Sequence, residues 1–327
     1  MERAPIGETI KFNEEPQQSY KLSYAFKQQL MKSWRPKPTL KCAITIYVII
    51  GLLFFALGIA ILVESNAIFE YQQQYDNACP TIGQNCSINF QITTQVNQPI
   101  YFFYRLTDFY QNHRRYVSSI DFNQLSGGVY VNTSAIADCA PVLTNADTWR
   151  TVSITNATLD PQQAAFPCGL VARSMFNDSF TLYLNSNGTN STINISNKGI
   201  AWPDDINYRY KNLNASQQHL QWADVEDERF MTWMKMAPFM DFRKTWGVIN
   251  SNLPIGNYTL VITNNWNSSI FGGQKWMVLS QTNAFGGTNY FLAYSYLAIG
   301  GVAILLAILF VFRKITRPKG MLDKKIR

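Results

Sequence analysis

Histidine is scarce in this chain, because His113 and His219 are the only two among 327 residues. Catalytic triads use histidine as their base, and it is a common ligand of zinc. The sequence also lacks the nucleophile elbow G-x-S-x-G, the metalloprotease motif H-E-x-x-H and the phosphate-binding loop G-x-x-x-x-G-K-[ST]. The residues therefore indicate no enzyme, no metal site and no cofactor.

Charge is missing from two long stretches. Residues 42–63 contain no charged side chain, and residues 276–312 contain none either. The last 23 residues of the second stretch, 290–312, are almost wholly apolar. A bilayer core about 30 Å thick needs about 20 apolar residues of helix. A cleaved signal peptide is disfavoured because 41 mostly polar residues come first. We therefore expect spanning helices at 42–63 and 290–312.

Basic residues are concentrated at the two ends. Residues 1–41 hold eight Lys and Arg and residues 313–327 hold seven, whereas residues 64–289 carry 13 basic and 16 acidic side chains. Lys and Arg beside a span favour the cytosol. We therefore expect two cytosolic tails and one lumenal or extracellular domain, residues 64–289. The net charge of +7 then arises mostly from the topology, and it favours attraction to anionic membrane lipids. It does not indicate binding to nucleic acid.

Glycosylation motifs and cysteines agree with that compartment. All ten Asn-x-Ser/Thr motifs fall in the central region. They begin at Asn85, Asn132, Asn156, Asn177, Asn187, Asn190, Asn194, Asn214, Asn257 and Asn267.

Four of the five cysteines lie in the same region, and Cys42 lies at the start of the first span. An even number of lumenal cysteines predicts two disulfides, for which three connectivities are possible. We favour Cys79–Cys86 and Cys139–Cys168, because short loops close most easily. A zinc site would need C-x2-C spacing or a nearby histidine, and neither is present.

Strand patterns dominate the central region. The runs "SINFQITTQV", "FTLYL", "YTLVITNNW" and "KWMVLSQT" are rich in β-branched and aromatic residues, and turn-forming residues separate them. The run "FMTWMKMAPFMDFRKTW" is ambiguous, although Pro238 prevents one continuous helix. We expect an integral membrane α+β protein in which two transmembrane helices flank a large, mostly antiparallel-β, disulfide-bonded and glycosylated ectodomain.

Two further patterns suggest helix contacts. Apolar residues recur every fourth position from 22 to 34, ending at Trp34, which predicts a short amphipathic helix that lies on the membrane or contacts a partner. In the first span Gly51 and Gly58 lie seven residues apart, and Ala303 and Ala307 share a face of the second. Small residues let helices approach closely in lipid, so the two glycines are candidates for a partner interface.

The stretch "YFFYRLTDFYQNHRRYVSSIDFNQLSG", residues 101–127, combines aromatics with an Arg pair. A lumenal location excludes RNA as its ligand, and no companions for catalysis surround its histidine. We expect most of its aromatics to pack in the core. Asn112, Arg114 and Arg115 are candidates for recognising a partner, since Tyr, Trp and Arg dominate interfaces; the alternative is that the arginines pair within the domain.

The run "FYQNHRRYVSSIDFNQLSG" resembles the signature of the cell division cycle protein 50 / ligand-effect modulator 3 family. Further similar motifs follow in the family's order: "FKQQLMKSWRP", "PCGLVARSMFNDSF", "GIAWPDD", "DERFMTWMKMAPFMDFRKTWG" and "LPIGNYTLVITNNWNSSIFGGQKWMVLSQTNAFGGTNYFLAYSY". The sequence differs from the family pattern at Thr288, where lysine is usual. The resemblance covers nearly the whole chain.

The resemblance implies a non-catalytic β subunit that forms a heterodimer with a type IV P-type ATPase, a phospholipid flippase. It implies that the subunit supports the ATPase's folding, its export from the endoplasmic reticulum to the Golgi, endosome or plasma membrane, and its movement of phospholipids between leaflets. The catalytic aspartate and the lipid path would belong to the partner. A stand-alone cell-surface receptor or adhesion glycoprotein is the main alternative, followed by an ecto-hydrolase.

Overall fold

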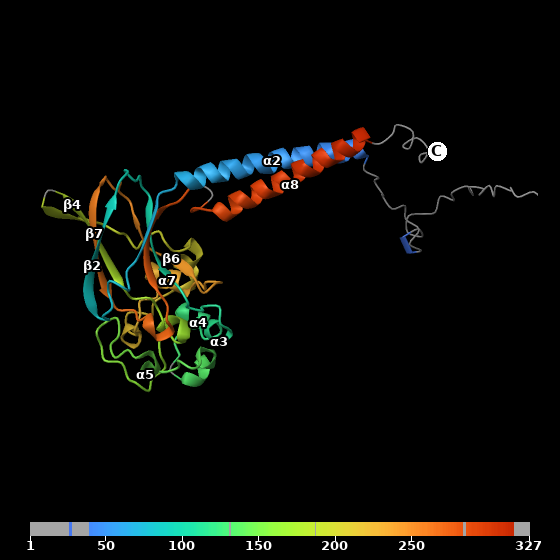
Figure 1. Ribbon diagram of the computed structural model, residues 1–327. Coiled ribbons are helices and arrows are strands. Elements are labelled where there is room, and N and C mark those ends of the chain that lie inside the picture. The colour runs from blue at the N-terminus through green and yellow to red at the C-terminus, as the bar shows by residue number, and fades with distance from the viewer. Residues whose placement is uncertain (1–25, 28–38, 131, 187, 284–285, 317–327) are drawn as a thin grey trace, which may run out of the picture. The chain divides into compact units, whose positions relative to one another are not determined.

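The computed structural model describes residues 26–27, 39–130, 132–186, 188–283 and 286–316 (Figure 1). They form two compact units. One comprises residues 54–299, and the other holds the described parts of 1–53 and 300–327. Trp34, and all of the expected amphipathic segment except Phe26 and Lys27, lie outside the described residues.

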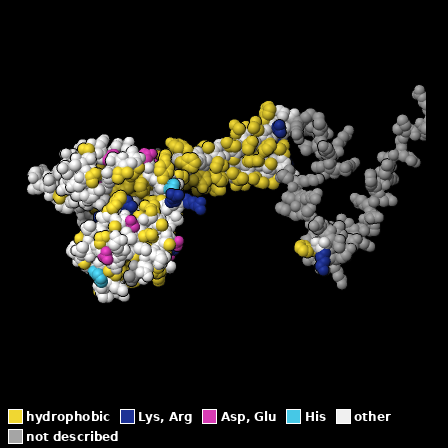
Figure 2. Space-filling model, turned by 90° about the horizontal axis from the view of Figure 1, so that it is seen from below, with side chains coloured by type: hydrophobic (Ala, Val, Ile, Leu, Met, Phe, Trp, Pro, Cys, Tyr) yellow, Lys and Arg dark blue, Asp and Glu magenta, His cyan; other side chains and the backbone are white. Residues whose placement is uncertain are grey.

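Among the described residues, two helices are long and apolar enough to cross a membrane, α2 (Leu40–Ala67) with 28 residues and α8 (Tyr290–Thr316) with 27. Yellow apolar side chains cover most of their visible surface in Figure 2. Both helices extend beyond the apolar spans expected from the sequence. Backbone hydrogen bonding continues through polar residues such as Glu64 and Ser65, so a helix does not end where its apolar run ends.

Eight strands form two antiparallel sheets between these helices. The first sheet has the order β1-β8-β3-β6 and the second β2-β7-β4-β5. The strands of the first sheet are β1 (Glu70–Gln74), β8 (Lys275–Gln281), β3 (Ile100–Leu106) and β6 (Phe242–Ile249). Those of the second are β2 (Gln84–Ile92), β7 (Gly256–Asn264), β4 (Ser179–Ser186) and β5 (Thr189–Ile193).

The two sheets share one hydrophobic core. Every second residue of β3 is buried, namely Ile100, Phe102, Tyr104 and Leu106. Phe102 meets Phe180 of β4, in the other sheet, with 4.8 Å between the ring centroids. Alternation with a period of two places one face of β3 in this core. The antiparallel ectodomain flanked by two apolar helices, expected from the sequence, is therefore confirmed.

Short helices fill the long connections between strands. They are α3 (Arg114–Val117), α4 (Phe122–Leu125), η1 (Thr133–Cys139), α5 (Asn145–Thr148), α6 (Leu170–Arg173), η2 (Asp205–Arg209), η3 (Gln218–Leu220), α7 (Glu228–Met234) and η4 (Ser269–Phe271). In Figure 1, α3, α4 and α5 gather at one end of the ectodomain. The ambiguous run around Pro238 resolves into helix α7, a turn that contains the proline, and strand β6.

Candidate functional site

The segment 109–112 lies along the segment 237–240, and so prolongs the contact between β3 and β6 past the ends of both strands. Both segments belong to motifs that the sequence analysis singled out. The hydrogen bonds that join them run from Phe109 N to Met240 O (3.2 Å), from Ala237 N to Gln111 Oε1 (2.9 Å) and from Asn112 Nδ2 to Pro238 O (2.8 Å).

These contacts bear on two residues of the signature motif. The amide nitrogen of Asn112 donates within the chain, so this exposed side chain braces the segment, and its role in recognising a partner stays a prediction. Tyr110 is 55% exposed, and its hydroxyl lies 3.0 Å from Met240 Sδ. Tyr110 is therefore not among the aromatics of this stretch that pack in the core, because the alternation of β3 ends at Leu106.

Helix α3 separates the signature motif into an inner and an outer side. Tyr116 is buried, and its hydroxyl lies 2.7 Å from Ser174 Oγ. Burial raises the pKa of Tyr116 to about 12. Arg114 and Arg115 are exposed. Within the described residues, neither guanidinium forms an ion pair or a side-chain hydrogen bond, so internal pairing of the two arginines is not found.

A cavity of about 800 Å³ opens beside α3. The signature segment contributes Tyr110, His113, Arg115, Tyr116 and Ser118 to its lining. Later parts of the chain contribute Ala140, Pro141 and Leu170. The cavity thus combines apolar surface with the Arg115 guanidinium and the His113 imidazole, and no acidic residue is among the described residues that line it.

Ser119 ties together the three segments that border this cavity. Its hydroxyl donates to Cys139 O over 2.7 Å and accepts from Leu170 N over 2.8 Å. Gly169 has a φ of +96°, and a Cβ there would lie 2.2 Å from Ser119 O. Glycine is therefore required where the segment of Leu170 approaches α3.

Two disulfides lie in the ectodomain, Cys79–Cys86 and Cys139–Cys168. They join the pairs that are nearest in sequence. The second bridge holds the residues that lead into Ala140 and Leu170, and so it belongs to the framework of the cavity. Cys42 is free and exposed.

Sequon asparagines lie on the surface. Asn187 is outside the described residues. Of the other nine, Asn267 is half-buried and eight are exposed. The exposed ones are Asn85, Asn132, Asn156, Asn177, Asn190, Asn194, Asn214 and Asn257. Each exposed side chain leaves room for a glycan.

The small residues of the first apolar helix contact the second helix of the same chain. A Cβ on Gly51 would lie 2.7 Å from Ile304 Cγ1, and one on Gly58 would lie 2.8 Å from Leu297 Cγ. Ala303 and Ala307 are buried. Gly51 and Gly58 therefore pack against α8 of this chain, and their place in a partner interface stays a prediction.

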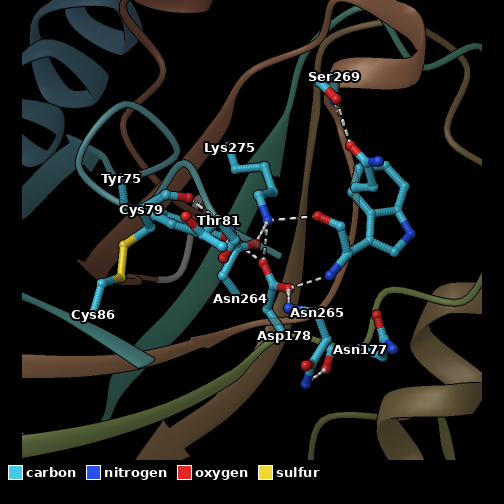
Figure 3. A network of polar contacts seen from close by, with 12 residues as sticks. Tyr75, Cys79, Thr81, Cys86, Asn177, Asp178, Asn264, Asn265, Ser269 and Lys275 are labelled. Atoms are coloured by element: carbon cyan, nitrogen blue, oxygen red, sulfur yellow. Dashed lines mark hydrogen bonds and ion pairs between the residues drawn. A yellow bond between two sulfur atoms is a disulfide. The ribbon is translucent and has the colours of Figure 1, made fainter. Parts of the chain in front are cut away.

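A buried polar network holds the sequon segment at Asn177 against the core (Figure 3). Lys275 Nζ lies 2.7 Å from Asp178 Oδ2, and it also donates to Trp266 O (2.6 Å) and to Asn264 Oδ1. Burial lowers the pKa of Lys275, and Asp178 opposes that shift. The Lys275 ammonium and both oxygens of the Asp178 carboxylate have hydrogen-bond partners within the protein, so we assign this network the structural role of a brace.

Within the described ranges, no three His, Cys, Asp or Glu side chains gather where they could hold a metal ion. The sequence reasoning missed Asp178 and Lys275. Asp178 stands inside a sequon, between two exposed residues, and Lys275 begins a strand, so neither position indicated burial.

Comparison with known proteins places these features in a family. The model of the ligand-effect modulator 3 (LEM3) / CDC50 family matches residues 61–320. "Cell cycle control protein 50A" of Mus musculus is 33% identical, over 87% of this chain and 86% of that protein. "ALA-interacting subunit 3" of Arabidopsis thaliana is 31% identical, over 91% and 87%. "Phospholipid-transporting ATPase accessory subunit CRF1" of Saccharomyces cerevisiae is 28% identical, over 91% and 86%.

Proposed function

The chain belongs to the LEM3 / CDC50 family, and we propose that it is a non-catalytic accessory subunit of a type IV P-type ATPase that moves phospholipids between leaflets. The observation that carries this proposal is the extent of the family match, which spans the ectodomain, the end of α2 and the whole of α8. The printed name of the yeast relative describes an accessory subunit of a phospholipid-transporting ATPase. A match over nearly the whole length supports the same role here.

The two helices anchor the subunit beside its partner, and the ectodomain covers the partner's lumenal loops. Assembly assists the ATPase's folding and its export from the endoplasmic reticulum to later membranes. The partner supplies ATP hydrolysis and the lipid path. The lack of catalytic motifs in the sequence agrees with this division of labour.

Both termini are cytosolic in this proposal, and residues 64–289 are lumenal. The basic flanks and the confinement of the sequons to the central region support this topology. Endoglycosidase treatment should lower the apparent mass in several steps. A protease added outside intact cells should spare an N-terminal tag, and removal of that tag would contradict the topology.

Affinity purification tests the function directly. The tagged chain is expressed with each type IV P-type ATPase of its source cell, in cells that lack other members of the family. One ATPase should be recovered in stoichiometric amount, and its lipid-stimulated ATP hydrolysis should depend on the tagged chain. Recovery of no such ATPase, with the chain folded at the cell surface, would favour the receptor or adhesion alternative.

We further propose that the outer side of α3 contacts the partner. Arg114 and Arg115 are exposed and unpaired among the described residues, whereas Tyr116 and Ser119 fix the helix from inside. Arginine suits such a contact because its planar fork pairs with carboxylates and carbonyls in a fixed geometry. Replacing both arginines with alanine should leave the subunit folded and lower the recovery of the ATPase.

A further inference from the structure

Arg114 and Arg115 differ from every other arginine of the ectodomain. Residues 64–289 contain eight arginines, and the guanidinium groups of six have partners. Ion pairs engage Arg105, Arg209 and Arg243, a carbonyl engages Arg229, and indole rings lie beside Arg150 and Arg173. No described residue pairs with the guanidinium of Arg114 or Arg115.

The two unpaired arginines are not equivalent. Arg115 lines the cavity beside α3, and Arg114 does not. His113 also lines it, together with the apolar side chains of Pro141 and Leu170. The cavity therefore offers the Arg115 guanidinium and the His113 imidazole beside apolar surface, which is the combination that an acidic side chain with an apolar neighbour would fill.

The cavity is preformed. Ser119 binds both Cys139 O and Leu170 N, and the Cys139–Cys168 disulfide joins the same two segments. Tyr116 anchors α3 from beneath through Ser174. A ligand that enters would therefore meet walls that are already ordered, which lowers the entropic cost of binding. No sequon asparagine is among the described residues of the lining.

We propose that this cavity receives an acidic side chain, followed or preceded by an apolar one, from a lumenal loop of the ATPase partner. The carboxylate lies between Arg115 and His113, and the apolar neighbour packs on Pro141 and Leu170. Tyr110, which is 55% exposed, borders the entrance with its ring. This inference rests on the proposed function and adds the chemistry of the partner's loop.

Two variants test the cavity, and one matched variant controls for charge. Arg115→Glu reverses the charge inside the cavity, and Ser118→Trp fills it without changing charge. Arg114→Glu makes the same charge change on the neighbouring residue, outside the lining. We expect the first two to lower the ATPase recovered per tagged subunit by roughly tenfold or more. Arg114 would contact the partner only at the solvated surface, so Arg114→Glu should lower the recovery by no more than about fivefold.

Each variant subunit is first purified alone in detergent, and its thermal unfolding midpoint and its disulfides are compared with those of wild type. Only variants that are folded by these two criteria are then tested for assembly with the ATPase. Arg115→Lys serves as a second variant at the same position. It keeps the positive charge but lacks the planar guanidinium with its paired donors, and it should retain more of the complex than Arg115→Glu.

A charge exchange then identifies the occupant. Each Asp or Glu in the lumenal loops of the ATPase is replaced by Lys and is combined with Arg115→Glu. We expect one such replacement to restore assembly with Arg115→Glu and to weaken it with the wild-type subunit. Failure of every replacement to restore assembly would overturn the assignment of an acidic loop.

Three other results would also overturn the proposal. The first is normal recovery of the ATPase with Arg115→Glu or with Ser118→Trp, and the second is a loss of recovery for Arg114→Glu that equals the loss for Arg115→Glu. The third is binding of the subunit to vesicles of anionic phospholipid that depends on Arg115, while Arg115→Glu leaves assembly with the ATPase unchanged. If instead the wild-type subunit recovered no ATPase, the proposed function itself would fail, and that outcome is visible before any variant is made.

Discussion

Lys275 and Asp178 form an ion pair of 2.7 Å whose two side chains are only 1% and 0% exposed. Both charges are fully surrounded by partners. Asp178 Oδ1 accepts from the backbone N–H groups of Asn265 and Trp266, each at 2.6 Å, and Oδ2 accepts from the Tyr75 hydroxyl at 2.7 Å. Removal of one partner leaves the other charge buried without compensation.

We therefore expect Lys275→Met to destabilise the protein by about 3–5 kcal/mol. The double variant Lys275→Met, Asp178→Leu should recover part of that loss, because no buried charge remains. Chemical denaturation of the purified chain in detergent measures both effects. Lys198→Met, at an exposed position, serves as the control and should change little. A loss below about 1 kcal/mol for Lys275→Met, the range of surface pairs, would contradict the assignment of a structural brace.

Lys244 should make stability depend on pH. Its ammonium nitrogen donates to the carbonyls of Thr232 and Trp233 near the end of α7, and to that of Lys235. Burial lowers its pKa from 10.5 to about 7. Between these two values the unfolded chain binds more protons than the folded chain, so the free energy of unfolding rises with pH.

Lys244 contributes a slope of up to about 1.4 kcal/mol per pH unit to the free energy of unfolding between pH 7 and pH 10.5. Lys244→Met removes the group, so the difference in stability between wild type and variant should grow in favour of wild type from pH 7 toward pH 10. Denaturation at several pH values gives this difference. Parallel curves for the two proteins would show that Lys244 keeps its ordinary pKa.

The two disulfides should contribute unequally. Cys139 and Cys168 are separated by 29 residues, and Cys79 and Cys86 by seven. The chain-entropy relation gives about 3.6 kcal/mol for the longer loop and about 2.4 kcal/mol for the shorter. Paired Cys→Ala variants, compared by thermal unfolding, should show the larger loss for Cys139 and Cys168. The reverse order would mean that the first bridge braces the native fold directly.

Gly58 should be essential for the contact of α2 with α8, whereas Gly301 should not. A Cβ at Gly58 would meet Leu297 at 2.8 Å, and one at Gly301 would have nothing within 4 Å. Gly58→Leu should therefore separate the helices, and Gly301→Leu is the matched control. Cysteines placed at Phe54 and Tyr296, whose ring centroids are 5.2 Å apart, report the contact by cross-linking in a Cys42→Ser background. Equal cross-linking in both variants would contradict the close packing.

Local patterns explain how much of this molecule the sequence predicts. Alternation in β3 and the charge-free spans are short-range signals, so strands and apolar helices could be inferred. Contacts between distant residues leave no such signal. Asp178 and Lys275 are 97 positions apart. Gly58 indicates that a neighbouring element packs closely on the first apolar helix, but the sequence does not show which element it is. The signature motif was recognised as a candidate contact, but only the folded chain shows that Asn112 binds the carbonyl of Pro238 and that Arg115 lines a cavity.

The positions of the sequons give the ectodomain two unlike sides. Asn85, Asn190 and Asn257 stand in strands of the β2-β7-β4-β5 sheet, and no described strand of the other sheet contains a sequon. Asn185 pairs with both Asn190 and Asn257, so these two sequons share one row across three strands. Adjacent strands are about 4.8 Å apart, so these two asparagines, with one strand between them, lie about 10 Å apart, within the reach of a branched sugar. Occupied sites would therefore form a continuous carbohydrate coat over this sheet, and the strands of the opposite sheet would remain bare protein.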